Sequence, residues 1–283
     1  MPDVRLRGGD LDGLALHYVV EGRGPAVVLV HGLGGFAESW RHNLPALADR
    51  ATVYALDLPG FGVSAKPRAP YDLPFFARVL HAFLDTLGVG QVSLVGHSLG
   101  GAVAVAAALR LPARVDRVAL VGAVVPGFAY RPAWVYRLVA VPGLGEALAL
   151  LGCAPLYRAA VARCLHAPRR AEVAFFVGHA YAERASAPAR AAYLATLRGV
   201  RRDFERHAQD YRRALATLDL PVLLIHGRQD RVVPAVHCAE VADALAHAAV
   251  RWVDACGHFP QIEHARTVNG WLVDFLVGRP APR

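Results

Sequence analysis

Lysine is almost missing from this chain: Lys66 is the single lysine, so nearly all of the 31 basic residues are arginines. Long apolar runs are missing too. None approaches the ~18–20 residues of a transmembrane helix, so integral membrane association is not expected. The first residues also lack the apolar stretch of a secretory signal, which indicates a cytoplasmic protein.

Cysteine is scarce and irregularly spaced. The four cysteines, at positions 153, 164, 238 and 256, match neither a zinc site nor a dense disulfide framework. We therefore expect reduced, mostly buried thiols, with neither a metal nor an organic cofactor implied. The 283 residues, 55% of them hydrophobic, suffice for one large domain or for one domain that carries an insertion.

The positive charge is confined to one segment. Residues 127–215 hold 14 arginines against 6 acidic residues, whereas the remainder holds 17 basic and 17 acidic residues, so the whole net charge of +8 belongs to this segment. The favoured interpretation is a solvated, arginine-rich surface. The alternatives are attraction of an anionic substrate, an acidic carrier protein or an anionic lipid surface. Nucleic acid is not expected as a partner, because no recognition motif is present.

Apolar strand-like runs alternate with helical segments along most of the chain. The expected strands are 3–6, 14–20, 26–30, 52–56, 91–95, 115–121, 221–225 and 250–253. The expected helices between and after them are about 37–49, 73–87, 101–110, 235–246 and 262–277. This alternation predicts an α/β fold with a mostly parallel sheet, an antiparallel start and helices on both faces.

The alternation stops between residues 127 and 215. Helices are expected there at 134–140, 144–151, 155–164, 170–184, 187–197 and 204–215, and no convincing strand is found. A helical block of this kind is inserted between two strands of the sheet. We therefore divide the chain into a core, residues 1–126 and 216–283, and an inserted helical segment, residues 127–215.

Ser98 lies in a Gly-x-Ser-x-Gly motif, Gly96-His97-Ser98-Leu99-Gly100, between an expected strand and an expected helix. A serine at a sharp strand-to-helix turn has a strained backbone, and the flanking glycines avoid clashes. The turn exposes the hydroxyl at the end of the sheet, where the backbone N–H groups of the helix start also point. The motif predicts that Ser98 is a nucleophile.

A serine nucleophile needs a base, and His258 is the best candidate. In a parallel sheet the working residues lie in loops at the carboxyl ends of strands, and His258 follows the last expected strand. His264 is the rival, but it is expected inside the following helix. His97 is expected to point away from the site, and His31 and His226 are interpreted as structural or supporting residues.

The base in turn needs an orienting acid, for which Asp230 is proposed. Asp230 follows the strand at 221–225, so its loop is expected to adjoin that of His258. The order Ser98, Asp230, His258 is the expected one for a triad around this motif. Asp254 is the runner-up, although its closeness to His258 in sequence disfavours a good contact, and Asp57 is interpreted as a turn residue.

Two backbone amides are candidates for an oxyanion hole, which stabilises the negative oxygen of a tetrahedral intermediate. Leu99 follows Ser98 directly, and Leu33 lies in the loop His31-Gly32-Leu33-Gly34-Gly35. Glycines in that loop allow the backbone to approach the reacting atoms closely.

These motifs together resemble the α/β-hydrolase superfamily. The resemblance rests on the loops at 31–35, 57–62, 96–101, 227–230 and 257–258, and it covers almost the whole chain. It implies an eight-stranded α/β-hydrolase fold in which a helical cap, here residues 127–215, is inserted after the sixth strand. Haloalkane dehalogenases and epoxide hydrolases of this layout have Asp at the nucleophile position, so Ser98 argues against both.

The resemblance leaves the substrate open. Carboxylesterases, lipase-like enzymes and the carbon–carbon bond hydrolases of aromatic degradation all have a serine nucleophile. The last group often has a different residue before the serine, so His97 favours an esterase. Trp134 and Leu138 begin an apolar segment that would roof the site and bind a hydrophobic acyl or alkyl group of a small ester. A different class, a non-catalytic receptor on this fold, is disfavoured by the complete triad.

Overall fold

The structure is a computed structural model that describes residues 3–130, 134–151, 153–184, 186–245 and 248–277. Eight strands form a single sheet, in the order β1-β2-β4-β3-β5-β6-β7-β8. The strands are β1 (Asp3–Arg5), β2 (Ala15–Glu21), β3 (Ala26–Val30), β4 (Thr52–Leu56), β5 (Val92–His97), β6 (Val115–Val121), β7 (Val222–Gly227) and β8 (Ala248–Val253). Strands β1, β2 and β4 pair antiparallel and all other neighbours pair parallel, so the predicted mostly parallel sheet is confirmed.

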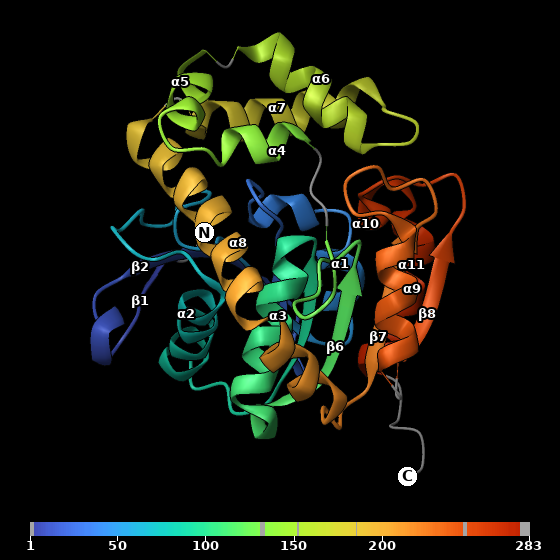
Figure 1. The fold of residues 1–283 in the computed structure, drawn as a ribbon. Coiled ribbons are helices and arrows are strands. Elements are labelled where there is room, and N and C mark those ends of the chain that lie inside the picture. Colours follow the sequence, from blue (N-terminus) through green and yellow to red (C-terminus); the bar gives the residue numbers. More distant parts are fainter. Residues whose placement is uncertain (1–2, 131–133, 152, 185, 246–247, 278–283) are drawn as a thin grey trace.

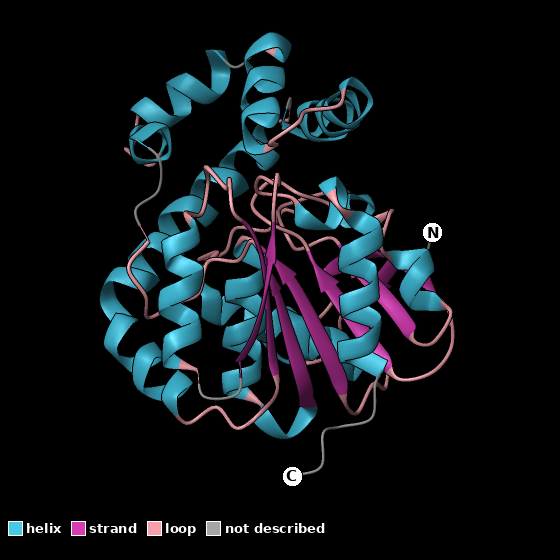
Figure 2. Ribbon diagram, turned by 90° about the vertical axis from the view of Figure 1, so that its right-hand side faces the viewer, coloured by secondary structure: helices cyan, strands magenta, loops and turns pink. Residues whose placement is uncertain are grey.

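Helices cover both faces of the sheet, as predicted (Figure 2). The core helices are α1 (Leu44–Ala48), α2 (Leu73–Thr86), α3 (Leu99–Arg110), α9 (Ala235–Ala244), α10 (Pro260–Glu263) and α11 (Ala265–Val277), with the short 3₁₀ turns η1 (Gly9–Leu11), η2 (Ala37–Trp40) and η3 (Pro112–Arg114). Apolar side chains of α2, α3 and α9 form one core layer, and those of α1 and α11 form the other. The central strand β3 is apolar throughout because both of its faces are buried between these layers.

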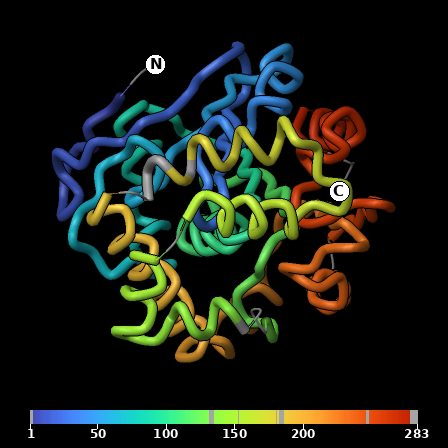
Figure 3. The backbone as a smooth tube through the Cα atoms, turned by 90° about the horizontal axis from the view of Figure 1, so that it is seen from above, coloured from blue at the N-terminus to red at the C-terminus, as the bar shows by residue number. Residues whose placement is uncertain are grey.

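The chain between β6 and β7 forms five helices, which we call the cap. They are α4 (Trp134–Val139), α5 (Leu144–Leu151), α6 (Ala154–Cys164), α7 (Arg170–Arg184) and α8 (Ala187–Ala216). The cap lies beyond the carboxyl ends of the parallel strands (Figures 1 and 2), and a view from above shows its helices crossing over the core (Figure 3). Among the residues that the structure describes, no single helix is both long and apolar enough to cross a membrane.

Four predicted helices have the wrong extent. The helix expected at 262–277 begins earlier, at Pro260, and is divided at His264 into α10 and α11. The helix expected at 37–49 is divided into η2 and α1, because Pro45 has no N–H with which to continue a helix from the preceding turn. The two helices expected at 187–197 and 204–215 are present in α8 as two segments, but the kink between them lies at His207, so the first segment is longer than predicted. Gly199 suits this helix because a β-carbon there would lie 2.5 Å from the carbonyl oxygen of Pro70.

Candidate active site

Ser98 occupies the sharp turn between β5 and α3. Its φ of 53° lies in the left-handed region, which a residue with a side chain adopts at a cost in strain. Glycines make the turn possible: a β-carbon on Gly96 would lie 2.3 Å from the carbonyl oxygen of Gly100, and one on Gly100 would lie 2.2 Å from that of Val30. The turn that carries Ser98 therefore requires glycine at positions 96 and 100, because neighbouring backbone atoms leave no room there for a side chain.

The turn is anchored to the next strand. The Ser98 N–H donates to the carbonyl of Val121 at 3.1 Å, and the Ser98 carbonyl accepts from the N–H groups of Gly101 and Val124. These bonds fix the serine at the carboxyl end of β6, which is the part of the sheet where the other two predicted triad residues converge.

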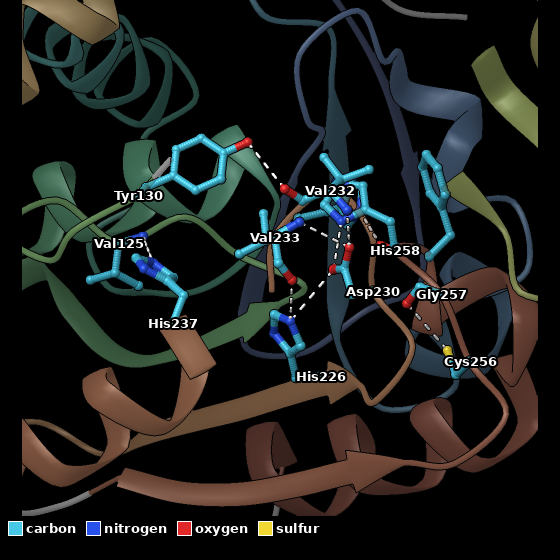
Figure 4. Close-up of polar contacts among 12 residues, drawn as sticks. Val125, Tyr130, His226, Asp230, Val232, Val233, His237, Cys256, Gly257 and His258 are labelled. Carbon is cyan, nitrogen blue, oxygen red and sulfur yellow. Dashed lines mark hydrogen bonds and ion pairs between the residues drawn. The ribbon is translucent and has the colours of Figure 1, made fainter. Parts of the chain in front are cut away.

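Asp230 and His258 form a buried pair in the loops after β7 and β8 (Figure 4). His258 Nδ1 and Asp230 Oδ2 are 2.8 Å apart. The other carboxylate oxygen, Oδ1, accepts the N–H groups of Val232 at 2.7 Å and Val233 at 2.9 Å. With both oxygens engaged, the carboxylate orients the imidazole so that Nε2 is left for another partner.

The pKa of Asp230 lies below its ordinary value. Burial alone would raise this pKa, but the neighbouring charge of His258 and its hydrogen bond to the carboxylate outweigh the burial. His226, whose Nε2 is 3.5 Å from Asp230 Oδ2, acts in the same direction. The carboxylate therefore stays ionised at neutral pH and can stabilise a positive charge on His258.

Gly122 has no side chain, and this allows the buried pair to lie close to the end of β6 and so to Ser98. A β-carbon on Gly122, directly after β6, would lie 2.9 Å from the His258 carbonyl oxygen and 3.5 Å from its Nδ1. Since Ser98 is bonded to the preceding residue, Val121, the structure brings Ser98, Asp230 and His258 to one end of β6. The Ser98 hydroxyl and the His258 ring are not hydrogen-bonded to each other. Such contacts are often long in an enzyme without substrate and shorten in the complex.

The loop with the proposed second oxyanion donor lies directly against Ser98. A β-carbon on Gly32 would approach the β-carbon of Ser98 to 2.9 Å, so only glycine fits there. Leu99 is the first residue of α3, where helical N–H groups have no acceptor within the helix. Within the described chain no acceptor engages the Leu33 N–H either. Both amides are thus free to donate to a substrate oxygen, as the proposed oxyanion hole requires.

The rival residues have other partners. Asp254 is exposed and forms an ion pair with Arg228, with Nε and Oδ1 2.8 Å apart. Asp57 is buried, where its carboxylate accepts the N–H groups of Ala37 and Val63, and burial raises its pKa to about 6. His264 was expected inside a helix, but it lies at the break between α10 and α11. Its Nε2 donates to the carbonyl of Ala255. In the part of the chain that the structure describes, none of the three forms a hydrogen bond or an ion pair with His258.

The prediction that His97 points away from the site is wrong. Its Nε2 donates to the carbonyl oxygen of His258 at 2.9 Å, and its ring stacks on Phe259 with the centroids 4.7 Å apart. His97 therefore holds the loop of the proposed base. The only signal in the sequence is its place inside the serine motif, which fixes its backbone but not its side chain.

Glu263 is a second residue that the sequence analysis missed. Its Oε1 accepts the N–H groups of Gly257 at 2.9 Å and Phe259 at 3.3 Å, on either side of His258. Its Oε2 accepts the N–H of His166, at the end of α6, at 2.7 Å. The His258 N–H itself donates to the carbonyl of Cys164 at 2.7 Å. The cap and the loop of the proposed base are therefore joined directly.

Aromatic side chains line this junction of cap and core. Phe36, just after the loop at 31–35, packs on Phe175 and Phe176 of α7 and stacks on His179, with ring centroids 4.8 Å apart. Phe259 also packs on Phe176, with ring centroids 5.1 Å apart. The candidate substrate contact Leu138 is 41% exposed, and the side chain of Trp134 lies outside the part of the chain that the structure describes. Their predicted role stays a prediction.

The cysteines are free thiols: Cys238 and Cys256 are buried, Cys164 is partly buried and Cys153 is exposed. Among the described residues, no three His, Cys, Asp or Glu side chains are grouped so that they could hold a metal ion.

The eight-stranded sheet and the serine turn define an α/β hydrolase. A family model described as alpha/beta hydrolase fold matches residues 25–265, so the chain belongs to this family, and its resemblance to the superfamily is confirmed. The curated 2-hydroxymuconate semialdehyde hydrolase of Pseudomonas sp. strain CF600 is 31% identical over 263 residues, which cover 90% of this chain and 88% of that protein.

Two solved structures are similar over nearly the whole chain. The 2-hydroxy-6-oxo-6-phenylhexa-2,4-dienoate hydrolase of Rhodococcus sp. strain RHA1 has a TM-score of 0.82 and 29% identity, covering 96% of this chain and 97% of that one. The enol-lactonase of Burkholderia xenovorans LB400 has a TM-score of 0.78 and 26% identity, covering 97% and 99%. The protein is therefore a hydrolase.

Acid is expected to destabilise the fold through His31 and His97. Burial lowers the pKa of His31 to about 4 and that of His97 to about 3, and the charge of His258 adds to the effect at His97. Between these values and about 6.5 the unfolded chain binds more protons than the folded chain, so stability present above pH 6.5 is lost as the pH falls. At pH 5 each residue should cost about 2 kcal/mol relative to pH 7.

Urea unfolding at pH 7 and pH 5 measures this loss. In His97→Gln, whose amide can still donate to the His258 carbonyl, the decrease between the two pH values should be smaller by about 2 kcal/mol. Equal decreases in the wild type and the variant would contradict the burial argument.

Proposed function

We propose that the protein hydrolyses a carbon–carbon bond beside a ketone in a conjugated hydroxy-oxo-dienoic acid, the type of compound formed when an aromatic ring is opened. The observation that carries this proposal is the serine turn beside the buried Asp230–His258 pair, in a chain similar to two hydrolases that are named for compounds of this type. This differs from the esterase that His97 favoured, because similarity over about nine-tenths of the chain outweighs one residue.

The proposed reaction has two halves. Ser98 Oγ attacks the ketone carbon while His258 takes its proton, and the Leu33 and Leu99 amides stabilise the oxyanion. The carbon–carbon bond breaks in the keto tautomer of the substrate, in which the enol proton has moved to the carbon beside the ketone. The electrons of the bond pass through the adjacent double bond to the 2-oxo oxygen, and this enolate oxygen takes back the proton held by His258. Water, deprotonated by His258, releases the acyl group from Ser98 as a carboxylic acid.

The aromatic residues at the site suit such a substrate. Phe36 follows the oxyanion loop and Phe259 follows His258, and both contact Phe176 of the cap. Planar apolar side chains near the reacting groups favour a planar conjugated substrate with an aryl or alkyl end, because offset or edge contacts between such groups are favourable.

Ester or lactone hydrolysis is the second candidate. It needs the same nucleophile, base and oxyanion donors, and the similarity to an enol-lactonase favours it. The two candidates differ only in the atom that leaves, which is carbon in one and oxygen in the other.

The two bond types can be compared in one experiment. The protein is mixed with 2-hydroxy-6-oxo-6-phenylhexa-2,4-dienoate, and the loss of its visible absorbance is recorded with the benzoate formed, beside p-nitrophenyl butyrate. We expect kcat/KM to be at least about tenfold higher for the dienoate. Ser98→Ala should lose both activities, which excludes contaminating enzymes. A preference for the ester would favour the second candidate, and turnover of neither would overturn both.

A further inference from the structure

Helix α5 is apolar all round and yet exposed. Its sequence, Leu-Gly-Glu-Ala-Leu-Ala-Leu-Leu, contains one charged residue, and Gly145 is its only buried residue. The leucines Leu150 and Leu151 are 69% and 76% exposed. A helix that is hydrophobic on every side is normally buried in a protein core or in a membrane. The composition of α5 therefore points to an apolar partner that the fold itself does not provide.

Further exposed apolar side chains lie on either side of α5 in the sequence, on α4 and α6 and between α4 and α5. Eight large apolar side chains between positions 135 and 156 are exposed, and we call them the outer patch. They are Val135, Leu138, Val141, Leu144, Leu148, Leu150, Leu151 and Leu156. Elsewhere in the described chain such side chains are exposed singly, as at Val63 and Val236. Single exposed residues are ordinary, whereas a concentration of this size marks an interaction site.

The border of the outer patch is positively charged. Five exposed arginines lie on the same helices or just after them: Arg137, Arg158, Arg163, Arg169 and Arg170. None forms an ion pair within the part of the chain that the structure describes. The single acidic residue of this stretch, Glu146, is bound by Arg198, with contacts of 2.7 and 2.9 Å. A partner of this surface should therefore combine apolar and anionic groups.

Helices α5 and α6 lie on the side of the cap away from the sheet (Figure 1). They have 8 and 11 residues, which is too short for either to span a bilayer of about 30 Å, and the pair is sharply bent at its junction. On α6, Leu156, Ala159, Ala160 and Arg163 are exposed at helical spacing, so its outer face changes from apolar to basic. This geometry fits helices that lie in the interface of a membrane.

We propose that the outer patch docks the cap onto an anionic lipid surface. The leucines of α5 and Leu156 enter the boundary between headgroups and acyl chains, and the surrounding arginines contact anionic headgroups. A second copy of the chain fits less well, because a symmetric dimer through this surface would bring five arginines against five. Docking is independent of the bond that the enzyme cleaves, and it is measured without turnover.

Vesicle co-sedimentation tests this docking with the intact protein. We expect sedimentation with phosphatidylcholine vesicles that contain phosphatidylglycerol, and much less with phosphatidylcholine alone. The double variant Leu150→Asp/Leu151→Asp should reduce partitioning about a hundredfold, since it removes two apolar anchors and adds two negative charges. Arg158→Gln/Arg163→Gln should reduce it about tenfold or more on anionic vesicles.

Matched variants outside the outer patch distinguish specific docking from nonspecific binding to vesicles. Val236→Asp in α9 removes an equally exposed apolar side chain, and Arg206→Gln in α8 removes an exposed arginine. Both should sediment like the wild type, and circular dichroism should show all variants folded. Failure of the wild type to sediment with anionic vesicles would overturn the proposal. Equal losses of sedimentation in the matched variants would overturn it too. The same holds if the wild type binds no vesicles but forms a dimer, detected by light scattering, that Leu150→Asp/Leu151→Asp disrupts.

Discussion

Replacement of Ser98 by alanine is expected to lower kcat/KM by about 10⁴- to 10⁶-fold, whichever bond the enzyme cleaves. The fold should survive, because the backbone of the turn is held by its bonds to Val121, Gly101 and Val124 and not by the hydroxyl. A fluorophosphonate reports the nucleophile without reference to substrate, since it transfers its phosphonyl group to an activated serine and releases fluoride. Mass spectrometry should find one phosphonyl group, on Ser98.

The control for this labelling is heat-denatured protein, in which the triad is lost and no adduct should form. Absence of an adduct in the folded protein would mean that Ser98 is not activated, and the receptor interpretation would then be preferred. An adduct on another serine would show that the nucleophile has been wrongly assigned.

Asp230→Asn is expected to reduce kcat by about 10⁴-fold at neutral pH. The amide can still occupy the site between Val232, Val233 and His258, but it carries no charge to stabilise the imidazolium and can favour the wrong tautomer. The loss should appear in kcat more than in KM, because Asp230 is buried behind His258 and is not exposed to substrate.

Asp254→Asn is the matched control, since Asp254 is the runner-up for the orienting acid. It is exposed and paired with Arg228, so its replacement should change kcat less than about twofold. Steady-state kinetics of the two variants side by side distinguishes the acids. A large loss in Asp254→Asn, with little loss in Asp230→Asn, would reverse the assignment.

The sheet and the positions of the proposed triad residues could be predicted because both depend on short-range patterns. Strands such as Val27–Val30 and Val222–Ile225 are continuous apolar runs because both faces are buried, and such runs are visible in a sequence. The loops after them must then meet at one edge of the sheet. That rule, together with the order of the three residues in the chain, selected His258 and Asp230, and these two residues are 2.8 Å apart in the structure.

The contacts that were missed join a side chain to the backbone of an irregular loop. His97 and Glu263 both bind the backbone of the loop around His258. Every residue has a backbone carbonyl, and all but proline have an N–H, so the sequence does not indicate which of them a side chain will bind. Nor does the sequence indicate that the Cys164 carbonyl accepts the His258 N–H. Helix ends were misplaced where a local rule competed with packing, as at Gly199, where close approach of another backbone keeps a glycine inside the first segment of α8, which ends at the kink at His207.

The join between Cys164 and His258 limits how this cap can change in evolution. The bond is made by a carbonyl and an amide, so the side chain at position 164 can vary freely without breaking it. The spacing of the chain cannot vary in the same way: one residue inserted or deleted near position 164 would move another carbonyl into place and shift His166 away from Glu263. In related proteins this segment should therefore tolerate substitutions and exclude gaps, and a transplanted cap should retain activity only when it is spliced outside residues 164–166.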